Sequence, residues 1–242
     1  MTAPDKSRRL LITALGALGA AQLTGCASGG RISAAAVLGD ALGLIRGSND
    51  AYPLTDDEIL ANPGAQLGVR VENHGPGVFQ LIGEGTPGAY EHQWLIGGPI
   101  LLATHYGRIC STRGFVPELT GLQMHGEDPL IRICRGENAR YAHALQSVRF
   151  ARRSTEHAAE YDEQIAVLRP RGDMGVTVLG REYSCEVWHE TVITKTADQR
   201  HENTFYVHKA SGHILQSFQK PFHDSPLIRT ELLKAPGPGP RA

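Results

Sequence analysis

The stretch AYEHQWLIGGPILLATHYGRICST, from Ala89 to Thr112, decides the fold class. Two breaks, Gly97-Gly98-Pro99 and Tyr106-Gly107, divide it into three runs of five to eight residues that are rich in apolar side chains. Runs of this length between glycine and proline turns are typical of short strands. Links of two or three residues join antiparallel neighbours, because a parallel crossover needs a dozen residues or more. The stretch therefore predicts three consecutive antiparallel strands.

The same period-two pattern continues on both sides of this stretch. Upstream, Leu67, Val69 and Val71 alternate with small or polar residues, and the turn NHGPG (73–77) leads into the apolar run Val78–Ile82. Together with the three runs above, these predict five short strands joined as consecutive hairpins. Further runs typical of strands follow downstream, namely Ala142–Arg153 (which could instead be helical), Val176–Gly180, Arg181–Thr194, Thr204–Lys209, His213–Gln219 and Leu227–Leu233.

Helical signals are few. Thr55-Asp56-Asp57-Glu58 forms a capping box, which predicts a short helix at about residues 55–61. The run Ala34–Ile45 could form a second helix, although its glycines weaken it. Residues 113–140 are expected to be irregular and polar. The predicted fold is therefore mainly β: a single antiparallel β domain of about ten strands, a curved sheet or barrel-like, with one or two short helices near the N-terminus.

The first 26 residues carry the most specific motif. A basic opening, MTAPDKSRR, precedes the uncharged run LLITALGALGAAQLTG (Leu10–Gly25). This run is shorter than the roughly 20 residues of a transmembrane helix, and its length and flanks are typical of a signal peptide. Leu23-Thr24-Gly25-Cys26 resembles the lipobox of bacterial lipoproteins, which predicts lipidation of the Cys26 thiol and cleavage before it. The paired arginines leave both general secretion and twin-arginine export open.

These signals set the expected organisation of the chain. Residues 1–25 are predicted to be a lipoprotein signal peptide, 26–50 a tether, 51–235 the β domain and 236–242 a Pro/Gly tail that cannot continue a strand. Two or more acyl chains on Cys26 would hold the protein stably on a membrane. Because alanine rather than aspartate follows the cysteine, we expect the periplasmic face of the outer membrane.

Composition narrows the possible functions. Lys plus Arg number 24 and Asp plus Glu 25, and the resulting net charge of −1 argues against a nucleic-acid partner. The sequence has no phosphate-binding loop and no GxSxG, HExxH or CxxC motif, so no cofactor is predicted. Among the eleven histidines, His201, His208 and His213 are the candidate metal ligands. Strand alternation does not bring them to one ion, so no metal site is predicted.

One run of acidic residues is compatible with an enzymatic function. Glu182, Glu186 and Glu190 recur along one predicted strand, Arg181–Thr194, together with Trp188. Glycosidases use pairs of carboxylates at roughly 5–10 Å, and alternate residues of a strand lie at such a separation. Alternating acids also describe the solvent face of a strand. The hypothesis kept from this pattern is a periplasmic glycan-modifying enzyme.

Three cysteines remain beyond Cys26, namely Cys110, Cys134 and Cys185. The periplasm is oxidising, but an odd number leaves at least one free thiol. Strand alternation makes Cys110 and Cys134 the favoured pair for a disulfide. Buried, unreactive thiols are the alternative.

Several segments together resemble the YjbF/GfcB family of bacterial lipoproteins. The most specific is QWLIGGPILLATHYGRICSTRGF (Gln93–Phe115), with a Trp-Leu pair, a short turn, a strand that ends in threonine and an H-x-G-R turn. NPGAQLGVRV (Asn62–Val71), Asp128-Pro129-Leu130, ENTFYVHKASGHILQSFQ (Glu202–Gln219) and Leu232-Leu233-Lys234 fit the same pattern in order. The resemblance implies a mainly β, barrel-like lipoprotein associated with exopolysaccharide and group 4 capsule production. It carries over no catalytic residues.

The function expected is therefore non-enzymatic. The chain is predicted to be an outer-membrane lipoprotein that assists exopolysaccharide or capsule assembly and export, as a scaffold or as a module that binds a glycan or partner. The expected partners are the membrane, through the lipid on Cys26, polysaccharide-export or envelope proteins, and the polysaccharide itself. Arg108, Trp94 and Trp188 are the candidate contact residues. Their alternatives are structural: pairing within a hairpin for the arginine and core packing for the tryptophans.

Overall fold

The computed structural model describes residues 51–72, 74–84, 90–96, 100–137, 143–151, 160–195 and 198–241, all within one compact unit that spans Ala34–Ala242. Its strands form one antiparallel sheet in the order β5-β4-β3-β2-β1-β12-β11-β10-β9-β8-β7-β6. The strands are β1 (Gln66–Val71), β2 (Pro76–Glu84), β3 (Glu91–Ile96), β4 (Ile100–His105), β5 (Arg108–Arg113), β6 (Glu118–His125), β7 (His143–Ala151), β8 (Glu160–Val178), β9 (Arg181–Thr194), β10 (Arg200–His208), β11 (Ile214–Gln219) and β12 (Ile228–Lys234).

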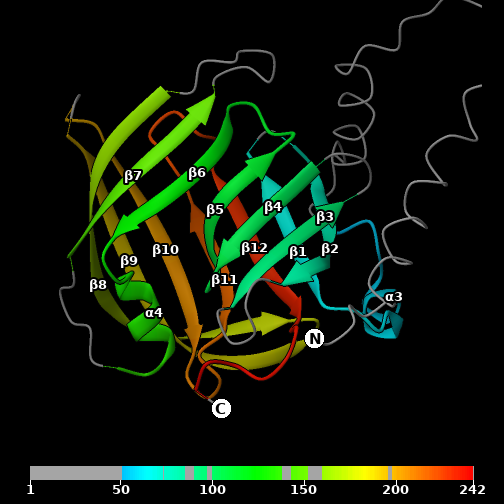
Figure 1. Ribbon diagram of the computed structural model, residues 1–242. Coiled ribbons are helices and arrows are strands. Elements are labelled where there is room, and N and C mark those ends of the chain that lie inside the picture. The colour runs from blue at the N-terminus through cyan, green and yellow to red at the C-terminus, as the bar shows by residue number, and fades with distance from the viewer. Residues whose placement is uncertain are drawn as a thin grey trace, which may run out of the picture. The chain divides into compact units, whose positions relative to one another are not determined.

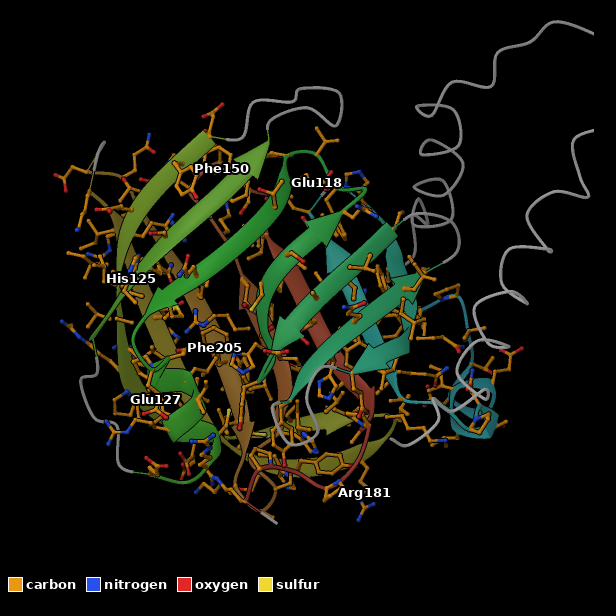
Figure 2. All side chains as sticks on the ribbon, viewed as in Figure 1. Glu118, His125, Glu127, Phe150, Arg181 and Phe205 are labelled. Carbon is orange, nitrogen blue, oxygen red and sulfur yellow. The ribbon has the colours of Figure 1, made fainter. Side chains whose placement is uncertain are left out.

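The sheet curls into a nearly closed barrel (Figure 1). Its two edges, β5 and β6, come together at a seam, where the backbone N–H of Leu119 donates to Thr112 Oγ1 at 2.8 Å. Figure 2 places Glu118 and Phe150 at one end of the barrel and Arg181 at the other. We call the end with Arg181 the tail end, because the C-terminal segment lies there (Figure 1).

The predicted meander of hairpins is confirmed. Strands β1 to β5 pair in sequence order, with Trp94 opposite Leu102 in the third hairpin. Between β4 and β5, Tyr106 and Gly107 have φ of +47° and +79°. A two-residue hairpin link favours positive φ at both positions, because its twist then matches that of the strands. A Cβ on Gly107 would also lie 2.9 Å from the Cβ of Ile214, so glycine is required there.

The central part of the chain differs from the expectation. Residues 113–140 were predicted to be irregular, but they contain β6 and the helix α4 (Pro129–Cys134). Asp128 caps this helix by accepting a hydrogen bond from the Leu130 N–H at 2.9 Å, and Pro129 provides a preset first turn. One helix therefore lies in mid-chain rather than near the N-terminus, and Ala142–Arg153 is a strand, β7.

The other helix is where the capping box predicts it. α3 (Asp56–Ala61) begins after Thr55, whose side chain accepts from the Glu58 N–H, while Glu58 accepts in return from the Thr55 N–H. The predicted helix Ala34–Ile45, the signal peptide and the tether lie outside the described residues. No helix in the described ranges combines the length and the hydropathy that a bilayer span requires.

The described residues form three hydrophobic clusters, two large ones and a small one of Ala144, Ala166 and Val192. The largest one contains Ile59 of α3 and the inward side chains of β1, β2, β4 and β12, with Phe79 and Leu102 fully buried. The second surrounds α4, where Leu130 and Ile133 pack among Leu168, Trp188, Phe205, Val207 and Ile214 from β8 to β11. α4 thus fills the barrel near its tail end.

The cysteines do not form the predicted disulfide. Cys110, Cys134 and Cys185 are free, and the Sγ of Cys110 contacts the Arg108 carbonyl oxygen at 3.4 Å. The pairing was inferred from strand alternation, but Cys134 ends α4 and lies in its packed core. Burial raises the pKa of Cys110 and of Cys134 to about 12, so both thiols stay protonated and unreactive.

Candidate functional site

A buried ionic network joins β5, α4 and β9. The Arg108 guanidinium binds Asp128 through Nε and Nη2, at 2.5 and 3.1 Å from its two oxygens. It binds Glu190 through Nη1 and Nη2, at 2.9 and 2.8 Å. Asn203 donates to the same Glu190 at 2.7 Å, and the Phe205 ring centroid lies 5.3 Å from Arg108 Cζ. All three charged side chains are at most 3% exposed, so the network is structural.

The charge of this arginine is fixed by its partners. Burial by itself would lower the pKa of Arg108, but the carboxylates of Asp128 and Glu190 raise it well above its ordinary value. A guanidinium that meets two carboxylates in a fork geometry uses its donors fully. Arg108 was a candidate for contact with a partner, but its side chain is buried inside the barrel and cannot reach one. Its pairing reaches α4 and β9 rather than staying within the hairpin.

The acidic run on β9 is split among three environments. Glu182 is exposed near the tip of the β8–β9 hairpin, whereas Glu190 is fully buried in the network. Glu186 lies between them and accepts from Arg241 Nη1 at 3.3 Å and from Trp188 Nε1 at 3.4 Å. The predicted row of carboxylates is therefore not a set of equivalent groups on one open face.

The three candidate histidines are likewise held apart. The Nδ1 of His208 lies 2.8 Å from Ser211 Oγ, and the Nε2 of His213 lies 3.1 Å from the Gly237 carbonyl oxygen. His201 lies buried near the start of β10, and burial lowers its pKa to about 4. Within the part of the chain that the structure describes, no three His, Cys, Asp or Glu side chains are grouped as a metal site would require.

A cavity lined by rings lies at the tail end, between the β4–β5 turn and the β10–β11 turn. Tyr90, His92, Trp94, Tyr106 and His213 supply the rings, and we call this set the aromatic cleft. Pro236 and Pro240 of the C-terminal segment complete its wall. Its volume of about 40 Å³ accommodates only a few water molecules.

The rings of the cleft are packed against one another. The centroids of Tyr90 and Tyr106 lie 4.8 Å apart, and those of His92 and Trp94 lie 5.6 Å apart. Trp94 is oriented by its indole N–H, which donates to Thr104 Oγ1 at 3.0 Å. Burial lowers the pKa of His92 and of His213, so both imidazoles are neutral near pH 7. The cleft is therefore lined by uncharged rings, and the guanidinium of Arg135 lies against one of them, with Nη2 3.2 Å from Tyr106 Oη.

A second cavity adjoins the first. It has a volume of about 210 Å³ and shares Tyr90, His92 and Pro236 with the aromatic cleft. Glu84 and Glu91 add carboxylates to its wall, and the described residues that line the two cavities include no Lys or Arg. The C-terminal segment 235–241, which we call the tail, thus forms part of both walls.

The tail is anchored beyond the cleft by its last described residue. Arg241 donates to the carbonyl oxygens of Ile133, Cys134 and Lys209 at 2.8, 3.1 and 2.7 Å, and to Glu186. The first two are carbonyls at the C-terminal end of α4, where helices leave acceptors unsatisfied. Strand β12 ends at Lys234, as the Pro/Gly composition predicts, but the tail then packs against the barrel.

A larger cavity of about 410 Å³ lies at the opposite end of the barrel. Phe115, Pro117, Lys220 and His223 are among the residues around it. It is formed by the loops after β1, β5 and β11 and offers fewer rings than the aromatic cleft. The tail end is therefore the better candidate for a site that stacks on rings.

Comparison with known proteins agrees with the observed fold and with the family that the sequence resembles. The family model described as "Group 4 capsule polysaccharide lipoprotein gfcB, YjbF" matches residues 33–233. The chain belongs to this family. The uncharacterized lipoprotein GfcB of Escherichia coli (strain K12) is 26% identical over 175 residues, which cover 71% of this chain and 76% of that protein. The crystal structure of the hypothetical lipoprotein YmcC from Escherichia coli (K12) has the same fold, with a TM-score of 0.67 and 22% identity over 75% of this chain and 89% of that one.

Of the rings that line the cleft in this YjbF-family protein, the sequence analysis predicted only Trp94 as a contact residue. Trp94 borders the aromatic cleft, although its side chain is only 2% exposed, whereas Trp188 lies in the core around α4. Tyr90 and Tyr106 were missed. Both have positive φ, at +52° and +47°. The two-residue link accounts for the value at Tyr106, but it gave no sign that the ring of Tyr106 would meet that of Tyr90.

Proposed function

We propose that this protein is a non-enzymatic lipoprotein of the outer membrane, anchored through a lipid on Cys26 and facing the periplasm, that assists assembly or export of a capsule or exopolysaccharide. The observation that carries the proposal is the match of residues 33–233 to a family of group 4 capsule polysaccharide lipoproteins. The lipobox Leu23–Cys26 supports the anchor, and alanine after the cysteine supports the outer membrane.

The interior of the barrel supports binding rather than catalysis. Glu190, the most buried carboxylate of β9, is neutralised by Arg108 and has no access to solvent. A general acid or base must reach its substrate within hydrogen-bond distance. The alternative, a glycan-modifying enzyme that uses the carboxylates of residues 181–194, is therefore less well supported. Aromatic rings at the tail end suit contact with sugar rings, which supports a glycan or a glycan-bearing partner.

Deletion of the gene tests the proposal under conditions in which the polysaccharide is made. We expect less polysaccharide on the cell surface, restored by the wild-type gene but not by a Cys26→Ser variant. The Cys185→Ser variant is the matched control, because it removes a thiol that lies in the described core and not at the lipobox. Unchanged surface polysaccharide in the deletion strain would refute the proposal. Full restoration by Cys26→Ser would refute the role of the anchor.

A further inference from the structure

We propose that the aromatic cleft is a binding site for an uncharged saccharide chain and that the tail occupies this site until the saccharide displaces it. This inference rests on the proposed function, which supplies a glycan as the partner. It adds the chemical class of the ligand, the place where it binds and a device that closes the site.

The volumes require the tail to move. With the tail in place, the cleft of about 40 Å³ is too small for a sugar ring. The neighbouring cavity of about 210 Å³ shares Tyr90, His92 and Pro236 with it. Lifting the tail would join the two and add the space of its own residues. The joined cleft would then reach the range of about 300–1,000 Å³ typical of ligand sites.

The lining selects an uncharged ligand. Tyr90 is the partly exposed ring of the lining, and its aromatic face suits the C–H face of a sugar ring. Tyr106 and Trp94 lie behind it, 6% and 2% exposed. Glu84 and Glu91 accept hydrogen bonds from hydroxyl groups but repel a carboxylate. Among the described residues that line the two cavities there is no Lys or Arg, so their walls offer an acidic polymer no counter-charge. Arg135 is the cation beside this lining, because its Nη2 donates to Tyr106 Oη at 3.2 Å.

The contacts between the tail and the cleft are few. Tyr90 Oη donates to the Pro238 carbonyl oxygen at 3.4 Å, and His213 Nε2 lies 3.1 Å from that of Gly237. The first contact is longer than the usual hydrogen bond of a hydroxyl donor, whereas the second has an ordinary length for a ring N–H donor. Pro236 and Pro240 of the tail line the cleft themselves. The tail therefore covers the cleft and is held to its rings by one long and one ordinary hydrogen bond.

Most of the hydrogen bonds that fix the tail to the barrel are made by Arg241, outside the cleft. Its side chain makes four hydrogen bonds, and its N–H donates to the Ser211 carbonyl oxygen at 3.0 Å. Arg241 does not line either cavity. Removal of this one side chain should therefore loosen the tail and leave unchanged the part of the lining that the barrel supplies. The tail also lies beyond residues 33–233, the part of the chain that matches the family.

The test compares three forms of the lipoprotein, each expressed with its own leader and solubilised in detergent: wild type, Arg241→Ala, and a chain that ends at Lys234. Calorimetric titration would use neutral hexasaccharides of glucose and of N-acetylglucosamine, and a hexamer of galacturonic acid as the acidic probe. Arg200→Ala is the matched control, because this exposed arginine lies at the start of β10, away from the tail, and pairs only with Glu202 in the described contacts. Circular dichroism checks that every variant is folded.

We expect a neutral hexasaccharide to bind Arg241→Ala and the shortened chain at least tenfold more tightly than wild type or Arg200→Ala. Adding Tyr90→Leu to Arg241→Ala should remove this gain, whereas adding Tyr161→Leu, an exposed tyrosine of β8, should not.

Three results would overturn the inference. If wild type and Arg241→Ala bound the neutral hexasaccharides with equal affinity, the tail would not occupy the site. If the folded variants bound no neutral hexasaccharide, the aromatic cleft would not be a saccharide site. If they bound only the galacturonic acid hexamer, the ligand would not be an uncharged saccharide. None of these results decides the proposed function, because its own test is the amount of polysaccharide on the cell surface.

Discussion

Replacing Arg108 by methionine tests whether the ionic network holds α4 in the barrel. Methionine fills much of the volume of the arginine stem but leaves Asp128 and Glu190 buried without their cation. Asp128 would keep one hydrogen bond, from the Leu130 N–H, and Glu190 would keep one, from Asn203. Both carboxylates would remain at most 3% exposed unless the end of the barrel opened.

The magnitude follows from the burial. Removing one partner from a buried ion pair typically costs about 3–5 kcal/mol of folding free energy, because the remaining charge is not compensated. In a domain of this size, each kcal/mol lowers the melting temperature by about 2–4 °C. We therefore expect Arg108→Met to melt roughly 6–20 °C below wild type. Arg200→Met should lose less than about 1 kcal/mol, because Arg200 and Glu202 are both more than half exposed.

The assay is urea denaturation followed by circular dichroism, with thermal melting as a second measurement. The double variant Arg108→Met/Glu190→Gln should be more stable than Arg108→Met alone, because it buries one charge fewer. If Arg108→Met were as stable as Arg200→Met, the network would not contribute to the fold. If the double variant were no better than the single one, burial of the carboxylate charge would not be the cause.

Three further outcomes are expected. Gly107→Val should destabilise the fold by about 2–4 kcal/mol in urea denaturation, because valine meets both a φ of +79° and the Ile214 side chain, whereas Gly121→Val, with open space around it, should not. The pKa of His201 is about 4 in the folded chain against about 6.5 unfolded, so its stabilisation is full above pH 6.5 and is lost as the pH falls towards 4. His201→Gln should therefore reduce the loss of stability over that range by up to about 3 kcal/mol, and an unchanged pH profile would contradict the assignment. Cys26→Ser should leave an uncleaved precursor on immunoblots, so a mature-sized band in the membrane fraction would argue against the lipobox.

The sequence predicted the hairpins because their signals are local. Between Leu67 and Thr112, glycine and proline turns alternate with period-two runs, and the capping box of α3 lies within four residues. α4 was missed because its six residues, PLIRIC, are apolar on almost every side, so no helical period stands out. Asp128-Pro129 was the available signal: a cap followed by a proline at the first helical position.

The candidate site was harder to predict for a different reason. Tyr90 and Pro238 contact each other across 148 residues, and Arg108 and Glu190 across 82. Contacts of this kind form only when the sheet closes, so no short segment of the sequence carries a signal for them. Trp94 was identified because an exposed tryptophan can stack on a sugar ring, not because its place in the cleft could be foreseen.

The seam between β5 and β6 makes the barrel mechanically asymmetric. Every other neighbouring pair in the described sheet is joined by a ladder of backbone hydrogen bonds, whereas these two edge strands are not paired. Parting the sheet at the seam breaks side-chain contacts such as that from Leu119 to Thr112, and parting it elsewhere breaks a whole ladder. Force or thermal fluctuation should therefore unzip the sheet from this line first. Slow-exchange amides would mark β9 and β10, while the amide of Leu119 should exchange early and report the opening.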